Sequence, residues 1–504
     1  MRKIVRCRHI FTEEGLLDGY LLISDGMIEK VGYGSPDDQE RMGTEYLNYE
    51  EGMIIPGLVD THCFFMGKYF QDYGEDFSGY GQEDLLLDFV NRGDRKLVLG
   101  RNVCEEAFRA LSEKSLPNRY PIVLFHSSFD EMLVNEKAEI KYAVNSGPVT
   151  MEGCVHLIEE ALKDEEAFLS AYEKHTGKLL AKGVTSVKEV AFDQGFGYLE
   201  ALEKYRMEKG IPIRTAVVSQ PVAKIWDISW AVDMKKRYAY EDFRFHGFNI
   251  MLDGSMSQEE AHLKKNYSGR GYTVRTVPDY EKAYDLVKAA DENDLAVSLH
   301  AQGGMAVAEG VRILSGMKKD KCGKLKNRHS MTDLEMGEDE EFRKMAELDI
   351  HAEIYPQIQS IYDDWRGKIN QVKGHVGEEY RRIWNRASMV SEGVSISCAT
   401  DLPLLFPDLP ESIYYACGGF VGESVEPFVE KNVMDRVSLI NAWTQGGIVS
   451  LYGREERLGK IREGYGADLA VYDRNLLEEP LNTIRDAKVL LTISRGKTSY
   501  KRFK

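Results

Sequence analysis

The stretch Ile54-Ile-Pro-Gly-Leu-Val-Asp-Thr-His-Cys-Phe64 has the form of a buried strand that ends in polar residues. Side chains two apart on a strand face the same way, so His62 and Phe64 share one face and Cys63 points to the other. A strand that delivers two histidines to a metal needs imidazole at both of those positions. Phe64 cannot coordinate a metal, so the stretch predicts an altered metal site at the end of a strand.

The chain has 504 residues, of which 43% are hydrophobic and 29% are charged, so it can bury a large core. Its formal net charge of -17 disfavours nucleic acid and anionic membrane surfaces as partners, because both require a basic protein surface. No apolar run is long enough to span a membrane, and the seven cysteines include no C-x-x-C pair. We therefore expect a cytoplasmic protein that acts on a small molecule.

Eight apolar segments alternate with amphipathic helical stretches, as in the βα units of a parallel barrel. They are residues 54–62, 183–188, 212–218, 247–252, 295–300, 327–331, 350–355 and 395–400. Short alternating strands with Gly-containing turns occupy both ends of the chain. We expect an α/β fold, a (β/α)8 TIM-like barrel over 54–455 with a small β-sandwich domain built from 1–53 and 456–504. A long insertion, 63–182, would roof the site.

Chemistry in such a barrel lies at the carboxyl ends of the strands. His62, His300 and Asp401 follow three different strands, which is enough for a site of two histidines and one carboxylate around a metal. A single histidine at a strand end is more often a hydrogen-bonded structural residue, and Asp401 could instead cap a helix. The joint placement of the three residues favours the metal or catalytic interpretation.

Other candidate site residues are a lysine, a histidine and three aromatic residues. Lys188 would bind a substrate carboxylate or act as an acid or base if it is buried, and would otherwise be paired with a neighbouring charge. Candidates for substrate binding are His126, Phe64, Tyr355 and Trp365. Core or helix-face packing is the simpler interpretation of these aromatic residues.

These residues, in this order, resemble the amidohydrolase superfamily, and the details resemble its branch of N-substituted formamide deformylases (amidohydrolase family 3). The likeness covers nearly the whole chain. Its motifs are Pro56-Gly-Leu-Val-Asp-Thr-His62, Gly183-Val-Thr-Ser-Val187, Asp253-Gly-Ser255, His300-Ala-Gln-Gly303, Ala399-Thr-Asp-Leu-Pro403 and Gly464-Tyr-Gly-Ala-Asp-Leu469.

The resemblance implies a metal centre made by a His-x-His pair, a carboxylated lysine, two further histidines and an aspartate. His62, His300 and Asp401 match this pattern, but Phe64, Asn249 and Met331 stand at three of the remaining positions. A neutral asparagine cannot bridge two cations. We therefore expect a departed centre with one divalent metal, zinc, held by the three matching residues. Whether His329, one residue out of phase with the lost histidine, replaces it stays open.

The resemblance favours a hydrolase that acts on a carbon–nitrogen bond, not a peptide bond, of a small molecule. In the expected mechanism the metal lowers the pKa of a bound water, Asp401 accepts the proton and returns it to the leaving nitrogen, and Asn249 donates a hydrogen bond to the carbonyl oxygen. The alternative is a metal-free barrel that binds a ligand or catalyses an isomerisation or elimination, with Lys188, Asp401 or His126 as catalytic residues. The resemblance also implies that homodimers are common.

Overall fold

A computed structural model describes residues 2–91, 95–222, 226–361 and 365–502. In this part of the chain, eight parallel strands form one sheet in the order β6-β12-β13-β14-β15-β16-β17-β18. The first and last strands meet, because the hydroxyls of Thr61 and Ser397 lie 2.8 Å apart and the Phe64 N–H donates to the Leu402 carbonyl at 2.7 Å. The sheet is therefore a closed parallel barrel, as the sequence predicts.

Each barrel strand overlaps one of the eight predicted segments. The strands are Leu58–Cys63 (β6), Val184–Phe192 (β12), Arg214–Gln220 (β13), Phe243–Met251 (β14), Ala296–His300 (β15), Ser330–Thr332 (β16), His351–Ile354 (β17) and Ser395–Cys398 (β18). Their side chains are almost all buried, which explains the near-continuous apolar runs in the sequence.

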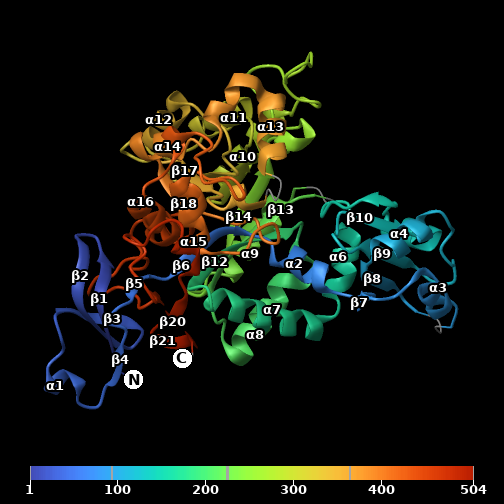
Figure 1. The fold of residues 1–504 in the computed structure, drawn as a ribbon. Coiled ribbons are helices and arrows are strands. Elements are labelled where there is room, and N and C mark those ends of the chain that lie inside the picture. The colour runs from blue at the N-terminus through green and yellow to red at the C-terminus, as the bar shows by residue number, and fades with distance from the viewer. Residues whose placement is uncertain (1, 92–94, 223–225, 362–364, 503–504) are drawn as a thin grey trace.

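Helices surround the barrel and cover its outer face (Figure 1). Helix α10 shows why these segments are helical: Asp279 caps its first turn by accepting the Lys282 N–H at 3.0 Å, and Ala283, Val287 and Ala290 form a buried stripe. The helices after β12 are Tyr198–Lys209 (α8), Ile228–Arg237 (α9), Tyr280–Glu292 (α10), Gly304–Ser315 (α11), Asp339–Leu348 (α12), Trp365–Val376 (α13), Arg386–Ser391 (α14), Leu409–Ser412 (α15), Arg436–Asn441 (α16) and Gly447–Tyr452 (α17).

Both ends of the chain contribute to a second sheet, of eight strands, with a hydrophobic core of its own. Strand β5 joins the two parts, because it pairs with β1 on one side and antiparallel with β19 on the other. The elements are Lys3–Thr12 (β1), Gly15–Ser24 (β2), Met27–Tyr33 (β3), Asp38–Arg41 (α1), Glu45–Asn48 (β4), Met53–Pro56 (β5), Leu469–Tyr472 (β19), Val489–Ser494 (β20) and Lys497–Lys501 (β21). The prediction that the chain ends share β structure is confirmed.

The segment between β6 and β12 contains a third sheet, in the order β11-β10-β9-β8-β7, on the side of the barrel away from the terminal sheet (Figure 1). Its elements are Phe65–Asp72 (α2), Glu75–Asp76 (β7), Gln82–Asn91 (α3), Val98–Val103 (β8), Glu105–Ser112 (α4), Ile122–His126 (β9), Glu131–Val134 (β10), Glu136–Tyr142 (α5), Gly147–Pro148 (β11), Val155–Leu162 (α6) and Glu165–Leu180 (α7).

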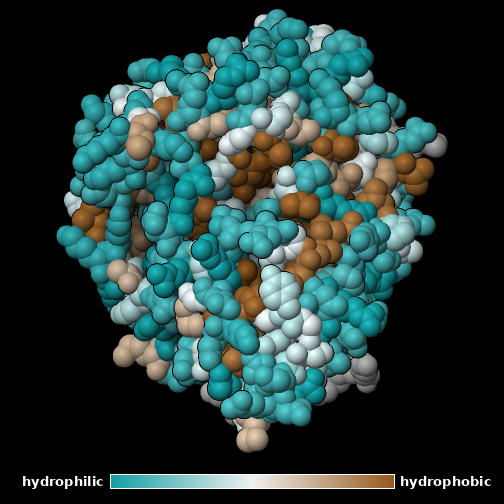
Figure 2. Space-filling model, turned by 90° about the vertical axis from the view of Figure 1, so that its left-hand side faces the viewer, coloured by the Kyte–Doolittle hydropathy of each residue, from teal (hydrophilic) through white to brown (hydrophobic). Residues whose placement is uncertain are grey.

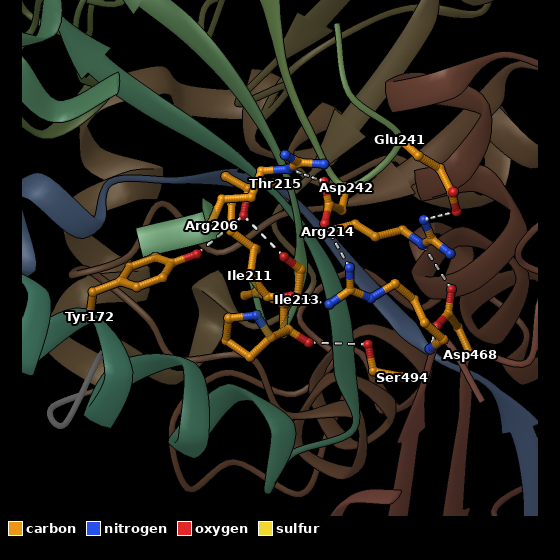
Figure 3. A network of polar contacts seen from close by, with 12 residues as sticks. Tyr172, Arg206, Ile211, Ile213, Arg214, Thr215, Glu241, Asp242, Asp468 and Ser494 are labelled. Atoms are coloured by element: carbon orange, nitrogen blue, oxygen red, sulfur yellow. Dashed lines mark hydrogen bonds and ion pairs between the residues drawn. The ribbon is translucent and has the colours of Figure 1, made fainter. Parts of the chain in front are cut away.

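A network of ion pairs joins the terminal sheet to the barrel (Figure 3). Arg214, at the start of β13, donates to Asp468 at 3.0 Å and to Glu241 at 2.8 Å. Nearby, Asp242 accepts from Arg495 of the terminal sheet at 2.7 Å. Because Arg214 and Asp468 are only 3% and 5% exposed, this contact fixes the position of the terminal sheet.

The molecular surface is mainly hydrophilic, and the face shown in Figure 2 has a hollow with apolar side chains at its bottom. Among the described residues, the structure contains no helix with the length and apolar character needed to cross a membrane.

Candidate functional site

A cavity of about 480 Å³ opens at the carboxyl ends of the barrel strands, where catalytic sites of such barrels lie. The insertion contributes Gln71, Met151 and Glu152 to its wall. The other lining residues are His62, Phe64, Val190, Phe192, Gln220, Asn249, Met251, His300, Tyr355, Asp401, Pro403 and Leu404. All three predicted metal ligands therefore face one cavity.

His62 lies at the end of β6 and is 6% exposed. Its Nε2 is 3.7 Å from Oδ1 of Asp401, and its Nδ1 is buried without a hydrogen-bond partner. Burial, together with the positive charges of Lys188 and His300, lowers the pKa of His62 to about 3. The imidazole is therefore neutral at physiological pH.

Asp401 follows β18 and is held beside His62 by the backbone. Its N–H donates to the His62 carbonyl at 2.8 Å, and its φ of 50° lies in the left-handed region, which is uncommon outside glycine. Desolvation in the cavity and the nearby carboxylate of Asp333 raise the pKa of Asp401. Its side chain remains 42% exposed, so water in the cavity reaches the carboxylate.

Asp60 supports this arrangement from beneath. Its carboxylate accepts the Thr400 hydroxyl at 2.5 Å and the N–H groups of His62 and Thr400 at 3.2 Å. The first and eighth strands are thereby tied together next to the two site residues.

His300, at the end of β15, is held between two carboxylates. Its Nε2 lies 2.8 Å from Oδ2 of Asp333, and its Nδ1 lies 3.5 Å from Oδ1 of Asp253. Burial lowers the pKa of His300, but the nearby carboxylates of Asp253 and Asp333 raise it well above its ordinary value. The ring is therefore held with a carboxylate on each side.

Asn249 lies on β14 at the wall of the cavity. Its Nδ2 donates to Oε1 of Gln220 at 2.6 Å, whereas its Oδ1 is buried without a partner. The free atom is thus an acceptor, suited to an N–H of a ligand. The predicted role of Asn249 as a donor to a carbonyl oxygen stays a prediction, and its donor group is shared with Gln220.

Lys188 does not line the cavity but lies inside the barrel, where it is 2% exposed. Its ammonium forms an ion pair with the buried carboxylate of Glu353 and donates to Ser298 at 2.8 Å. Glu353 also accepts the Ser450 hydroxyl at 3.1 Å. These contacts give Lys188 a structural role, and its predicted catalytic role stays a prediction.

The four predicted substrate-binding residues lie in different places. Phe64 forms part of the cavity wall and packs against Phe192 with tilted rings, 4.5 Å between centroids. The rings of Tyr355 and His62 lie 6.0 Å apart between centroids. His126 ends β9, outside the cavity lining, and its Nε2 lies 2.8 Å from Glu105. Trp365 begins α13, and its side chain lies outside the described part of the structure.

Among the described residues, the three predicted ligands are not assembled into a metal site, and the site stays a prediction. His62 and Asp401 face each other, but Nε2 of His300 lies 2.8 Å from Oδ2 of Asp333 and is therefore engaged by that carboxylate. Within the described ranges, no group of three His, Cys, Asp or Glu side chains is arranged to hold an ion. His329 cannot supply the missing ligand, because it is fully buried with Nε2 3.0 Å from Asp291 and Nδ1 accepting the Val297 N–H.

The sequence interpretation overlooked Asp333, which directly follows β16. The sequence places Met331 at the position of the lost histidine, but the Met331 side chain approaches Gly310 of α11 on the outer face of the barrel. Ser330 and Thr332 face inward instead, as their hydrogen bonds to Ser298 and Tyr355 show. The sequence signal for Asp333 as a site residue is its position as a polar residue directly after the strand.

A second cavity, of about 230 Å³, adjoins the first, since Tyr355 and Leu404 line both. Its wall is largely apolar and includes Ile358, Ile383 and Trp384. Asp333 and Gln302 lie at its polar end, where Gln302 donates to Asp333 at 3.0 Å. The two cavities together can take a small molecule with one reactive polar part and one apolar part.

Comparison with known proteins gives matches over most of the chain. A family model described as "Amidohydrolase family" matches residues 146–500. The putative amidohydrolase YtcJ of Bacillus subtilis (strain 168) is 23% identical over 535 residues, which cover 94% of each chain. An imidazolonepropionase of Streptococcus pyogenes serotype M1 is 30% identical over 102 residues, covering 19% of this chain and 23% of that protein.

Solved structures share the fold. An uncharacterized metal-dependent hydrolase from Pyrococcus furiosus superposes with a TM-score of 0.74 at 18% identity, covering 95% of this chain and all of that chain. Atrazine chlorohydrolase TrzN from Arthrobacter aurescens TC1, complexed with zinc, has a TM-score of 0.55 at 12% identity, covering 98% of this chain and 94% of that chain.

Proposed function

Because this chain belongs to the amidohydrolase family, we propose that it hydrolyses a carbon–nitrogen bond, other than a peptide bond, in a small molecule. The observation that carries the proposal is the position of Asp401. Its carboxylate stands at the end of the eighth strand, open to the cavity, and lies beside the neutral imidazole of His62. The likeness of the motifs to N-substituted formamide deformylases supports N-substituted amides as the substrate class.

In the proposed reaction Asp401 acts first as general base and then as general acid. It accepts a proton from a water molecule as the water oxygen forms a bond to the substrate carbonyl carbon. When the carbon–nitrogen bond breaks, Asp401 returns this proton to the leaving nitrogen. A pKa above the ordinary range of aspartate favours the first step, because it makes the Asp401 carboxylate a stronger base toward the proton of the water molecule.

The substrate would lie across both cavities. Its reacting carbonyl would lie near Asp401, and its N–H would donate to the unpartnered Oδ1 of Asn249. Its apolar part would occupy the 230 Å³ cavity against Trp384 and Tyr355. We therefore propose an amide with an apolar substituent about the size of a phenyl or branched alkyl group.

Amidohydrolases generally depend on a metal, and TrzN has been solved with zinc. Here His300 is engaged by Asp253 and Asp333, so we assign no step of the reaction to a metal. Metal analysis by mass spectrometry of protein purified without chelator is expected to find zinc far below one ion per chain. About one zinc per chain would show instead that His300 leaves Asp333 and completes the predicted site.

The reaction is tested with a panel of N-formyl and N-acetyl amines that carry aromatic or branched alkyl substituents, by measuring amine release. Asp401→Asn is expected to lower kcat on the order of a hundredfold to ten-thousandfold, with a much smaller change in KM. Asp233→Asn is the matched control, because this carboxylate is 72% exposed and remote from the cavity. No hydrolysis of any compound, or full activity of Asp401→Asn, would refute the proposal.

A further inference from the structure

A cavity of about 270 Å³ lies at the end of the barrel opposite the candidate site. It opens where strands begin: Arg244 and His246 lie near the start of β14, Ala296 starts β15, and Arg328 precedes β16. The end of α9 forms the other wall through Lys235. The cavity shares no lining residue with either cavity at the carboxyl ends of the strands.

Positive charge is concentrated in this cavity, although the chain as a whole carries a net charge of -17. Asp294 is the only acidic residue that lines it in the described structure. The carboxylate of Asp294 lies 3.2 Å from Lys326, and its backbone carbonyl accepts from Lys235. The cationic residues that line the cavity are Lys235, Arg244, Lys326 and Arg328.

The two arginines lack a close carboxylate. In the described residues no carboxylate lies within 4.0 Å of Arg328, which donates only a long bond of 3.4 Å to the Leu451 carbonyl. Arg244 lies over the Tyr452 ring at 4.4 Å and reaches Glu456 only at 4.0 Å, and its Nε is buried without a hydrogen-bond partner. Burial, and next the charge of Arg244, lower the pKa of Arg328. Neighbouring guanidinium groups in this state repel each other, so a bound anion would stabilise them.

His246 provides a second polar group at the same cavity. It is 8% exposed, and no described hydrogen bond involves its imidazole. Burial, followed by the charges of Arg328, Lys188, Arg244 and Lys235, lowers the pKa of His246 well below its ordinary value. A neutral imidazole can donate a hydrogen bond to an anion without a further charge.

We propose that this cavity binds the phosphate group of a small phosphorylated molecule. Two guanidinium groups match a dianionic phosphate in charge and offer paired N–H donors to its oxygens. A single carboxylate has one negative charge and two oxygens, so it would satisfy fewer of these donors. The volume exceeds that of one phosphate group, so a second phosphate or a small organic part fits beside it. The site is separate from Asp401, and its existence does not depend on the hydrolytic function.

The test is titration of the full chain with inorganic pyrophosphate by calorimetry and thermal unfolding, at constant ionic strength. Saturable binding and a rise in Tm are expected. Arg328→Gln and Arg244→Gln are each expected to weaken binding about tenfold or more, since each removes a charge-assisted hydrogen bond. Arg312→Gln is the control for charge, because this half-exposed arginine is paired with Glu309 at 2.6 Å.

Asp401→Asn should bind pyrophosphate like the unchanged protein, which separates this inference from the proposed hydrolysis. His246→Asn is a smaller change at the same cavity and is also expected to weaken pyrophosphate binding. It tests the site even if the arginine variants do not fold. The inference is refuted by absence of saturable binding up to about 10 mM. Equal weakening in Arg312→Gln, or equally tight binding of citrate at the same ionic strength, would also overturn it.

Discussion

His329 shows how a residue that resembles a metal ligand can be entirely structural. The imidazole lies between β15 and α10, and Asp291 accepts from its Nε2 at 3.0 Å. Asp291 also accepts the Lys318 N–H at 2.8 Å and the Asn327 side chain at 2.7 Å. Burial alone would raise the pKa of Asp291, but the hydrogen bonds from His329, Lys318 and Asn327 lower it to about 2.

Asp291→Asn is therefore expected to destabilise the protein in a pH-dependent way. A carboxylate with a lowered pKa stabilises the fold above its unfolded pKa of about 4, and this contribution disappears as the pH falls to about 2. At pH 7 the variant should lose about 2 kcal/mol, since Asp291 is 2% exposed. Urea unfolding of both proteins between pH 7 and pH 3 measures this, and a difference that stays constant or grows toward acid pH contradicts the assignment.

The position of an individual site residue could be predicted only where it lies at the end of a barrel strand, because the strand fixes where its side chain lies. The sequence correctly brings His62, His300 and Asp401 to one cavity, because all three follow buried parallel strands. It does not reveal that Asp333 engages His300, since this contact joins the ends of two strands 33 residues apart in sequence. The sequence also does not reveal that Lys188 is buried, because its ion-pair partner Glu353 is 165 residues away in the sequence.

At the level of elements, strand β14 depends on a glycine. Gly247 has a φ of 151°, and a Cβ at this position would lie 1.9 Å from the Ala296 carbonyl oxygen of β15. The pairing of β13 with β14 also shifts by one residue between Val217 and Val218, next to Gly247. The glycine thus lets two barrel strands approach at an irregular point.

Gly247→Ala is expected to destabilise the barrel by about 2 kcal/mol or more, because the backbone of β14 must move away from β15. Gly177→Ala is the matched control: it lies inside α7 with open space around the missing Cβ. This control should gain about 0.5–1 kcal/mol from the higher helix propensity of alanine. The thermal unfolding midpoints should therefore shift in opposite directions, and equal shifts would contradict this account.

Strands with a long apolar pattern could be predicted, and short strands could not. All eight barrel strands overlap the predicted segments. Strands β7 and β11 contain two residues each, too few to show an alternating pattern. The third sheet could therefore be expected from the length of the insertion but not built from its sequence.

For the whole molecule, the contact between Arg214 and Asp468 joins parts of the chain that are 254 residues apart. Both side chains are buried, so removal of one partner leaves an uncompensated charge. The attachment of the terminal sheet therefore includes a polar contact that tolerates little change, beside the apolar packing of Met53 and Ile55 in the barrel core.

Arg214→Met is expected to cost about 3–5 kcal/mol of stability, and the double variant Arg214→Met/Asp468→Leu should recover much of this loss. Arg237→Met is the control, since its ion pair with Glu203 lies at the surface with the arginine 47% exposed. The control should change stability by less than about 1 kcal/mol. Chemical unfolding measures all four proteins, and a double variant less stable than Arg214→Met would show that the buried pair is not the cause.

Because β5 pairs with both β1 and β19, β5 lacks its second neighbour until the ribosome has made Leu469–Tyr472. During that time Met53–Pro56 exposes an unpaired edge that can recruit a strand from another nascent polypeptide. A premature stop codon before residue 469 would make this exposure permanent. Such truncated products are thus candidates for aggregation and for capture by chaperones.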